Sequence, residues 1–230
     1  KHALRQATIA RTLVPVLCGS ALNSKGVSLL LDAITEYLPS PSEIPPMKAM
    51  VPDTGEEIFL GPDSEGPLAA LAFKVVTDPF VGRLVYLRVY SGTFKPGESV
   101  HNVTKDIRER TGRVLAMHAN RREEVKEATA GHICAAIGLK GTFTGDTIAS
   151  SETPVMLEPP SFPEPVLSVA IEPATRADQE KLDQALIKLS DEDPTFNVGY
   201  NKETGQSLIS GMGELHLEVL VDRMRREFGV

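Results

Sequence analysis

The chain has 230 residues, of which 41% are hydrophobic and 24% are charged, so one to three packed globular domains are expected. Its formal net charge of −7 argues against a protein held to nucleic acid by its overall field. No apolar run approaches the roughly 20 residues of a membrane span and no signal peptide is recognisable, which indicates a cytoplasmic protein without membrane contact. Cys18 and Cys134 lack metal-ligand neighbours, which predicts reduced, buried thiols and no metal site.

Residues 1–41 read as the end of an α/β domain. The run LVPVLC over residues 13–18 is rich in β-forming residues and predicts a strand. A helix is predicted next, because apolar residues recur at helical spacing from Val27 to Leu38, and it should end before Pro39. One strand and one helix cannot close a domain, so we expect residues 1–41 to be the C-terminal piece of a larger one.

The loop between that strand and helix contains GSAL, Gly19 to Leu22. Ligands of open α/β sheets bind at the carboxyl ends of the strands. A Ser-Ala loop there lets a backbone N–H meet a guanine carbonyl oxygen, although an ordinary loop is the commoner meaning of such a short pattern. The chain contains no G-x-x-x-x-G-K-[ST] sequence, so it offers no loop for the β- and γ-phosphates.

Residues 42–66 are dense in Pro, Gly and acidic residues, which predicts a connector of extended chain or loose hairpin. Short strand patterns separated by Gly and Pro turns fill residues 67–158, with alternating side chains from Arg83 to Tyr90. Repeated short strands without a long helix predict a small antiparallel β-barrel or sandwich.

Basic residues gather in the middle of this segment. Residues 105–122 carry six Lys or Arg against two Asp or Glu, and they include a single His but no Phe, Tyr or Trp. Such a run favours contact with an RNA backbone over base stacking, and a solvated charged face is an equally good interpretation. The candidate RNA-contact residues are Lys105, Arg108, Arg110, Arg113, Arg121 and Arg122.

Residues 159–230 follow a second proline-rich boundary and predict the order strand, helix, strand, strand, helix. This βαββα order is the ferredoxin-like arrangement without its last strand. In that arrangement the last strand pairs beside the first, so the first strand, Val166 to Glu172, should have an open edge. The whole chain is therefore predicted to be a multi-domain α+β protein, and we expect it to be a piece of a longer one.

The stretch SGMGELHLEV, Ser210 to Val219, has a composition that could indicate a phosphate or metal site. The third glycine of a dinucleotide fingerprint is missing, however, and no P-C-x-x-C accompanies the H-x-E pattern of His216 and Glu218. We interpret the stretch as a glycine turn that enters a packed helix.

The chain resembles elongation factor G, the ribosomal translocase of the translational GTPase family. The matching stretches follow the family's order over nearly the whole chain: CGSALNSKGV, LLDAITEYLPSP, GRLVYLRVYSGTFKPGESVHN, ERTGRVLAMHANRREEV, TGDTIA, EDPTF and SGMGELHLEVLVDRMRREF. The resemblance implies that residues 1–41 end a P-loop GTPase domain (the G domain), 42–66 connect, 67–158 form the β-barrel second domain, and 159–230 form a ferredoxin-like third domain without its last strand. One departure is Ala130-Gly131-His132, where the family commonly has Ala-Gly-Asp.

The resemblance also implies sites and partners. Ser20, Ala21 and Leu22 match the family's last guanine-binding motif, and GTP with Mg²⁺ is implied for the intact protein. The phosphate loop, the switches and the catalytic histidine have no match, so this chain alone is expected not to hydrolyse GTP. The implied partners are the ribosome, through small-subunit rRNA and a small-subunit protein, with tRNA and mRNA contacted indirectly by a monomer. A pocket that binds fusidic acid between the first and third domains of the family is matched by Pro163, Pro165, Asp193, Thr195 and His216.

These features lead to one functional hypothesis with two alternatives. The chain is expected to belong to an elongation factor that couples GTP hydrolysis to movement of tRNA and mRNA, and to supply ribosome contact and inter-domain relay. The alternatives are a paralogous ribosome-protection or recycling GTPase, and a free-standing, non-catalytic rRNA-binding module.

Overall fold

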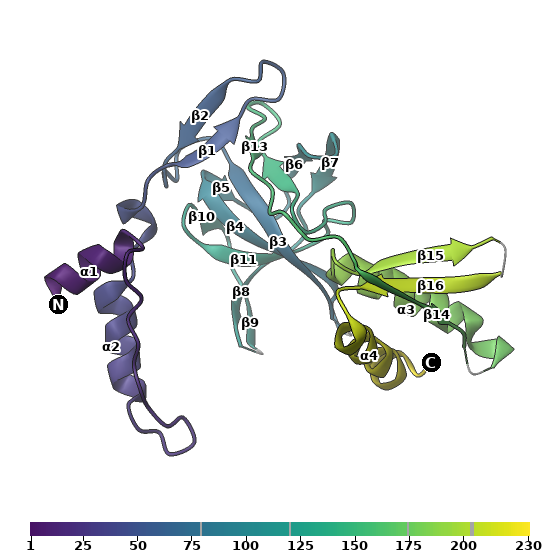
Figure 1. Ribbon diagram of the computed structural model, residues 1–230. Helices are drawn as coiled ribbons and strands as arrows, with labels where there is room; N and C mark the ends of the chain where they lie inside the picture. Colours follow the sequence, from purple (N-terminus) through teal and green to yellow (C-terminus); the bar gives the residue numbers. More distant parts are fainter. Residues whose placement is uncertain (79, 120, 174, 203–204) are drawn as a thin grey trace.

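The computed structural model describes residues 1–230 except 79, 120, 174, 203 and 204. Figure 1 shows three parts in chain order: a helical N-terminal part, a central β-barrel and a C-terminal domain of strands and helices. Every pairing between the named strands is antiparallel. The predicted α+β class is therefore confirmed.

The N-terminal part contains helices α1 (His2–Ile9) and α2 (Val27–Tyr37). Arg5 of α1 holds the two together, because its guanidinium donates to the carbonyl oxygen of Leu38 at 3.2 Å and to the carboxylate of Glu43 at 2.6 and 2.7 Å. Helix α2 ends before Pro39 as predicted. Helix α1 was not predicted from the sequence.

The strand predicted over residues 13–18 is wrong. These residues have no regular structure, and Val14 and Val16 are 81% and 92% exposed. An apolar run becomes a strand only when neighbouring strands accept its hydrogen bonds and cover its faces, and the described residues place no strand beside it. The prediction that both thiols are buried is also wrong, since Cys18 is exposed. Cys134 is buried, and desolvation raises the pKa of its thiol to about 12.

The connector forms a paired hairpin. After a short 3₁₀ turn (Pro41–Glu43), strand β1 (Met47–Met50) pairs with β2 (Glu57–Leu60) and with β13 (Met156–Leu157). Ala49, Leu60 and Leu157 pack in one cluster with Ala69 and Ala149 of the barrel. The hairpin is thus anchored to the barrel by its own apolar face.

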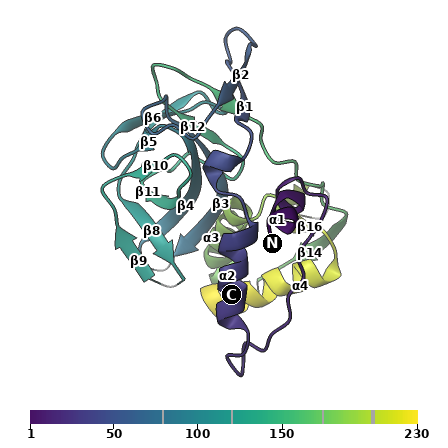
Figure 2. The same ribbon diagram turned by 90° about the vertical axis from the view of Figure 1, so that its left-hand side faces the viewer.

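The barrel is built mainly from one eight-stranded sheet in the order β7-β6-β12-β3-β4-β11-β8-β9, and Figure 2 shows its strands curling around the core. Strands β5 (Thr93–Phe94) and β10 (Ala128–Thr129) form a separate pair. The strands of the large sheet are β3 (Ala69–Asp78), β4 (Gly82–Ser91), β6 (Ser99–Asn102), β7 (Ile107–Arg110), β8 (Val114–His118), β9 (Arg121–Glu124), β11 (Ile133–Ile137) and β12 (Thr147–Ala149).

The alternation predicted along β4 is present. Val85, Leu87 and Val89 are fully buried in the barrel core, whereas Arg88 and Tyr90 are half-buried on the outer face. The strands β7 and β9 were not predicted. Both lie at ends of the sheet order and most of their side chains are exposed, so their sequences carry charges where an inner strand would carry apolar residues.

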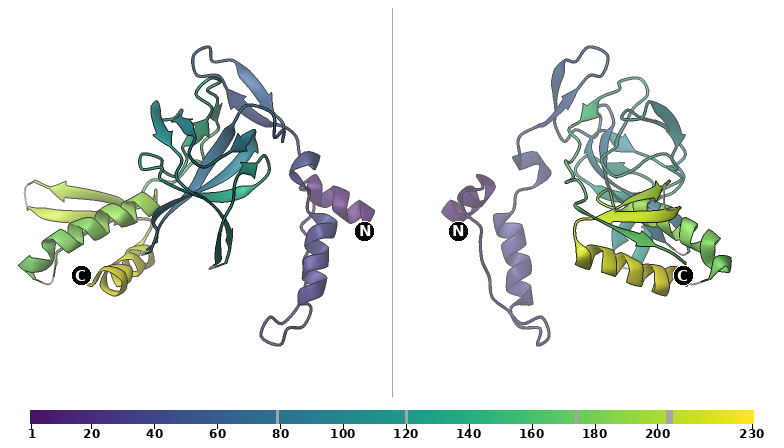
Figure 3. Two further views of the ribbon diagram at one scale, coloured as in Figure 1. Left: turned by 180° about the vertical axis from the view of Figure 1, so that it is seen from behind. Right: turned by 45° about the vertical axis from the view of Figure 1, so that its right-hand side comes forward.

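The C-terminal domain has the predicted βαββα order. It consists of β14 (Leu167–Ile171), a 3₁₀ turn (Arg176–Asp178), α3 (Gln179–Glu192), β15 (Asn197–Asn201), β16 (Gln206–Gly211) and α4 (Glu214–Arg223), which continues as a π-helical turn (Met224–Phe228). Leu182, Leu189, Phe196, Ile209 and Leu217 form its core. In Figure 3 both helices lie against one face of the sheet.

The open sheet edge predicted for the first strand is confirmed. The order is β14-β16-β15, and among the described residues β14 pairs only with β16. The other side of β14 therefore presents free backbone N–H and C=O groups.

Candidate nucleotide-binding, RNA-binding and inter-domain sites

The loop that contains Ser20, Ala21 and Leu22 is tight. Ser20 and Lys25 exchange two backbone hydrogen bonds of 3.0 Å each, and the Ser20 hydroxyl accepts from the Asn23 side chain at 3.1 Å. A Cβ on Gly19 would lie 2.9 Å from the Lys25 carbonyl oxygen, and Gly26 has a φ of +78°. The glycines therefore let the two ends of the loop meet.

The tip of this loop projects outward. The Leu22 side chain is 95% exposed, and among the described residues the N–H groups of Ala21 and Leu22 have no hydrogen-bond partner. Free amides beside small side chains can donate to the carbonyl oxygen of a flat base. The geometry is compatible with the predicted guanine contact, which stays a prediction.

The six predicted RNA-contact residues lie in two places. Lys105, Arg108 and Arg110 belong to the β6–β7 hairpin. Arg121 and Arg122 belong to β9, and Arg113 directly precedes β8 and pairs with Glu124 of β9. Strands β7 and β9 lie at the two ends of the sheet order, and Figure 1 shows them on different sides of the barrel. The run that is continuous in sequence is therefore not one continuous patch.

Four of the six cations already have partners within the chain. The Lys105 ammonium lies 3.5 Å above the Phe143 ring and 3.2 Å from Asp146. Arg110 donates to a backbone carbonyl, Arg113 pairs with Glu124, and Arg122 pairs with Asp78. Among the described residues, only Arg108 and Arg121 of this set are exposed with neither an ion pair nor a side-chain hydrogen bond.

Three residues of the predicted inter-domain pocket meet at the start of α4. Both the backbone N–H and the hydroxyl of Thr195 donate to Asp193 Oδ1, at 2.8 and 2.6 Å, and His216 Nε2 lies 2.9 Å from Asp193 Oδ2. The N–H of Met212 donates to His216 Nδ1 at 3.1 Å, so the remaining proton is on Nε2 and points to Asp193.

Burial alone would raise the pKa of Asp193. The hydrogen bonds from Thr195 and the contact with His216 outweigh that effect and lower the pKa of this carboxyl below its usual value. Asp193 is therefore a fixed, ionised acceptor at neutral pH. The other two predicted members, Pro163 and Pro165, lie in the extended segment before β14.

The stretch SGMGELHLEV bends at Met212 and Gly213 and enters a packed helix as predicted, but neither glycine has the left-handed backbone angles of a glycine turn, which corrects that part of the interpretation. Gly213 precedes α4 in extended conformation, with a φ of 162° and open space around it. Gly211 is needed for another reason, because a Cβ there would lie 2.8 Å from both His216 Nδ1 and Leu217 Cδ2. At Gly211 the backbone of β16 therefore lies in close contact with α4, and this contact holds the His216 ring in place.

At Ala130-Gly131-His132, where the sequence differs from the family, the histidine side chain forms a hydrogen bond within the turn. His132 Nδ1 accepts from the backbone N–H of Thr129 at 3.3 Å, as a carboxylate oxygen could. The imidazole therefore supplies an acceptor to this turn.

Sequence reasoning missed the junction between the barrel and the C-terminal domain. Glu192, at the end of α3, accepts from the backbone N–H of Thr77 at 2.6 Å and from Arg223 at 2.9 Å. Arg83 of β4 lies 3.7 Å from Asp191. No local pattern could have revealed these contacts, since Thr77 and Glu192 are 115 residues apart.

The described residues contain no group of three or more His, Cys, Asp or Glu side chains placed to hold a metal ion. In the same part of the chain, no helix is long and apolar enough to cross a membrane.

An antiparallel barrel followed by a βαββα domain is the arrangement expected from the resemblance to a translational GTPase. The family model described as elongation factor G domain 2 matches residues 67–151, and the one described as elongation factor G, domain III, matches residues 162–230. The chain therefore belongs to the elongation factor G family.

Two relatives show how far the similarity extends. Elongation factor G of Pseudothermotoga lettingae is 57% identical over 230 residues, which is 100% of this chain and 33% of the relative. A crystal structure of a protein from Thermus thermophilus matches with a TM-score of 0.76 at 33% identity, over 100% of this chain and 32% of that one. The chain thus spans about a third of the length of each.

Proposed function

We propose that this chain is part of a translation elongation factor that couples GTP hydrolysis to movement of tRNA and mRNA through the ribosome. The observation that carries the proposal is the 57% identity to an elongation factor G over all 230 residues. Within that protein, residues 1–41 would end the G domain, 42–66 connect, and 67–158 and 159–230 form the second and third domains. The protein would act as a cytoplasmic monomer.

The residues of the chain fit one end of the implied nucleotide. The unpaired amides at Ala21 and Leu22 suit the guanine edge, with Ser20 holding the loop. Bound GTP with Mg²⁺ would supply the phosphoryl chemistry, for which the chain has no phosphate loop. This part of the factor would therefore take part in base recognition but not in hydrolysis.

The barrel and the C-terminal domain would supply ribosome contact and relay. The exposed Arg108 and Arg121 are available for the backbone of small-subunit rRNA, and the C-terminal domain for a small-subunit protein. The Glu192 junction supports a relay, because it ties the end of β3 to both helices of the C-terminal domain. The Asp193, Thr195 and His216 group, with Pro163 and Pro165, is the proposed inter-domain pocket.

The proposal can be tested in a chimera. Replacing the matching 230 residues of the Pseudothermotoga lettingae factor with this chain should preserve ribosome-stimulated GTP hydrolysis. A chimera that is folded and binds GTP but is not stimulated by ribosomes would overturn the proposal. Stimulated hydrolysis without translocation would instead indicate a ribosome-protection or recycling factor. Tight, steeply salt-dependent binding of rRNA by the isolated chain would favour the free-standing RNA-binding module.

A further inference from the structure

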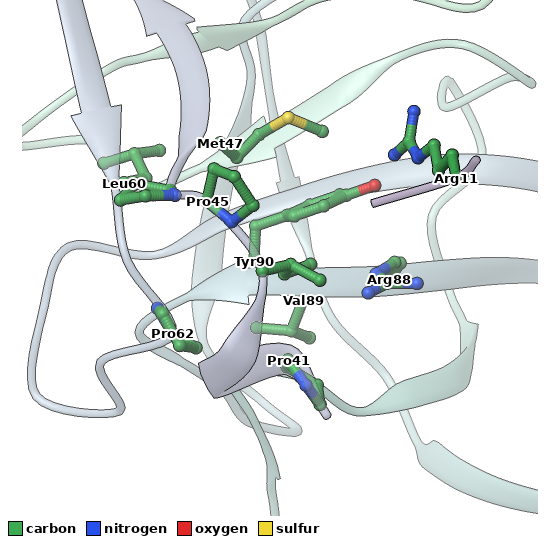
Figure 4. A pocket seen from close by; sticks show the side chains of 12 residues that line it. Arg11, Pro41, Pro45, Met47, Leu60, Pro62, Arg88, Val89 and Tyr90 are labelled. Atoms are coloured by element: carbon green, nitrogen blue, oxygen red, sulfur yellow. The ribbon is translucent and has the colours of Figure 1, made fainter. Parts of the chain in front are cut away.

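A pocket of about 370 Å³ lies between the N-terminal part and the outer face of β4 (Figure 4). Most of its wall is apolar and comes from the connector and the barrel, including Pro41, Pro45, Met47, Leu60 and Val89. Its volume falls within the range of small-molecule sites.

Two arginines from distant parts of the chain line this pocket. Arg11 comes from the segment after α1 and Arg88 from β4, and Figure 4 shows both side chains at the same end as the Tyr90 hydroxyl. The Arg88 guanidinium lies 5.2 Å from the centre of the Tyr90 ring. Leu60 and Pro62 lie at the other end. The pocket therefore has one cationic end and one apolar end.

The positive charge of this end is not neutralised by the part of the chain that the structure describes. No acidic side chain from those residues lines the pocket, although the chain carries 31 Asp and Glu. Among the described residues, neither guanidinium makes an ion pair or a hydrogen bond, and Arg88 Nε is buried without a partner. The two terminal nitrogens of Arg88 are not buried in this way, so an anionic oxygen in the pocket can accept from them.

We propose that this pocket is a binding site for a small apolar ligand that carries one anionic group, a carboxylate or a phosphate. The anionic group meets Arg88 and Arg11, and the apolar body lies against Pro45, Met47 and Leu60. Such a ligand contacts the N-terminal part, the connector and the barrel at once. Its binding therefore also fixes how the N-terminal part sits on the barrel.

The test titrates the isotope-labelled chain with octanoate and with octyl phosphate, and follows its amide NMR signals. Both ligands are expected to shift the signals of Val89 and Gly131 at the pocket. Comparing the two identifies the preferred anionic group. 1-Octanol, which lacks the charge, and acetate, which lacks the apolar body, should each bind at least about tenfold more weakly.

Two variants assign the binding to the arginines. Arg88→Gln and Arg11→Gln should each weaken octanoate binding by about tenfold, whereas the control Arg108→Gln, at an exposed arginine on β7, should not change it. Arg11 is exposed, so its variant stays informative if Arg88→Gln fails to fold. Equal binding of octanoate and 1-octanol, shifts that avoid Val89 and Gly131, or wild-type affinity in Arg11→Gln would each overturn the proposal.

Discussion

Glu192 offers the sharpest test of how the two larger domains are joined. Its carboxylate is 11% exposed and accepts from Thr77 of β3 and from Arg223 of α4. Replacing it with alanine leaves both donors without their acceptor. A hydrogen bond that involves a charged group contributes about 1.5–3 kcal/mol, and Arg223 retains Glu227, so we expect a total loss of about 3 kcal/mol.

The loss should appear in urea unfolding followed by far-UV circular dichroism, which reports mainly the helices. For a domain of this size m is about 1 kcal/mol/M, so the midpoint of the C-terminal transition should fall by about 3 M. Glu192→Gln keeps an acceptor but not the charge and should lose about half as much free energy. The control Glu218→Ala removes an exposed glutamate from α4 and should change stability by less than about 0.5 kcal/mol. If Glu192→Ala behaved like this control, the junction would not stabilise the fold.

Four further outcomes are expected. Gly211→Ala should lose about 1–3 kcal/mol in urea unfolding because the new Cβ overlaps the His216 ring, whereas Gly213→Ala should be close to neutral; equal effects would contradict the close-contact explanation. Because the pKa of Asp193 is lowered on folding, its stabilisation is present above about pH 3.9 and is lost as pH falls through the folded pKa, so Asp193→Asn should flatten the acid limb of stability against pH. A thiol reagent should label Cys18 in the native chain and Cys134 only after unfolding. Alternate amides of β14 should exchange rapidly; full protection would mean that another strand pairs with this edge.

Regular amphipathic patterns could be predicted from the sequence because burial follows from local spacing. The stripe of Leu182, Leu186 and Leu189 on α3 is buried, and so are the alternate residues of β4. Strand β9 could not be predicted, since all four residues of RREE are exposed and its strand conformation comes from pairing with β8. The strand prediction for residues 13–18 was wrong for the opposite reason. This run is rich in β-forming residues, but no strand lies beside it among the described residues.

The candidate sites also differ in how far they could be predicted from the sequence. The loop around Ser20 could be located from CGSALNSKG, because this stretch separates an apolar run from a helical pattern. The grouping of Asp193, Thr195 and His216 came from the family resemblance, and spacing alone could not have shown that one carboxylate holds both partners. The pocket between Arg11 and Arg88 is formed by three segments that pack together, so no local sequence pattern could have predicted it.

Translocation by the chimera is the most direct test of the proposed function. The matching residues of the Pseudothermotoga lettingae factor are exchanged for this chain, and movement of mRNA on the ribosome is followed by toeprinting with GTP. We expect a full codon shift at a rate near that of the unmodified factor. A folded, GTP-binding chimera that hydrolyses GTP on the ribosome and leaves the mRNA unmoved would contradict it.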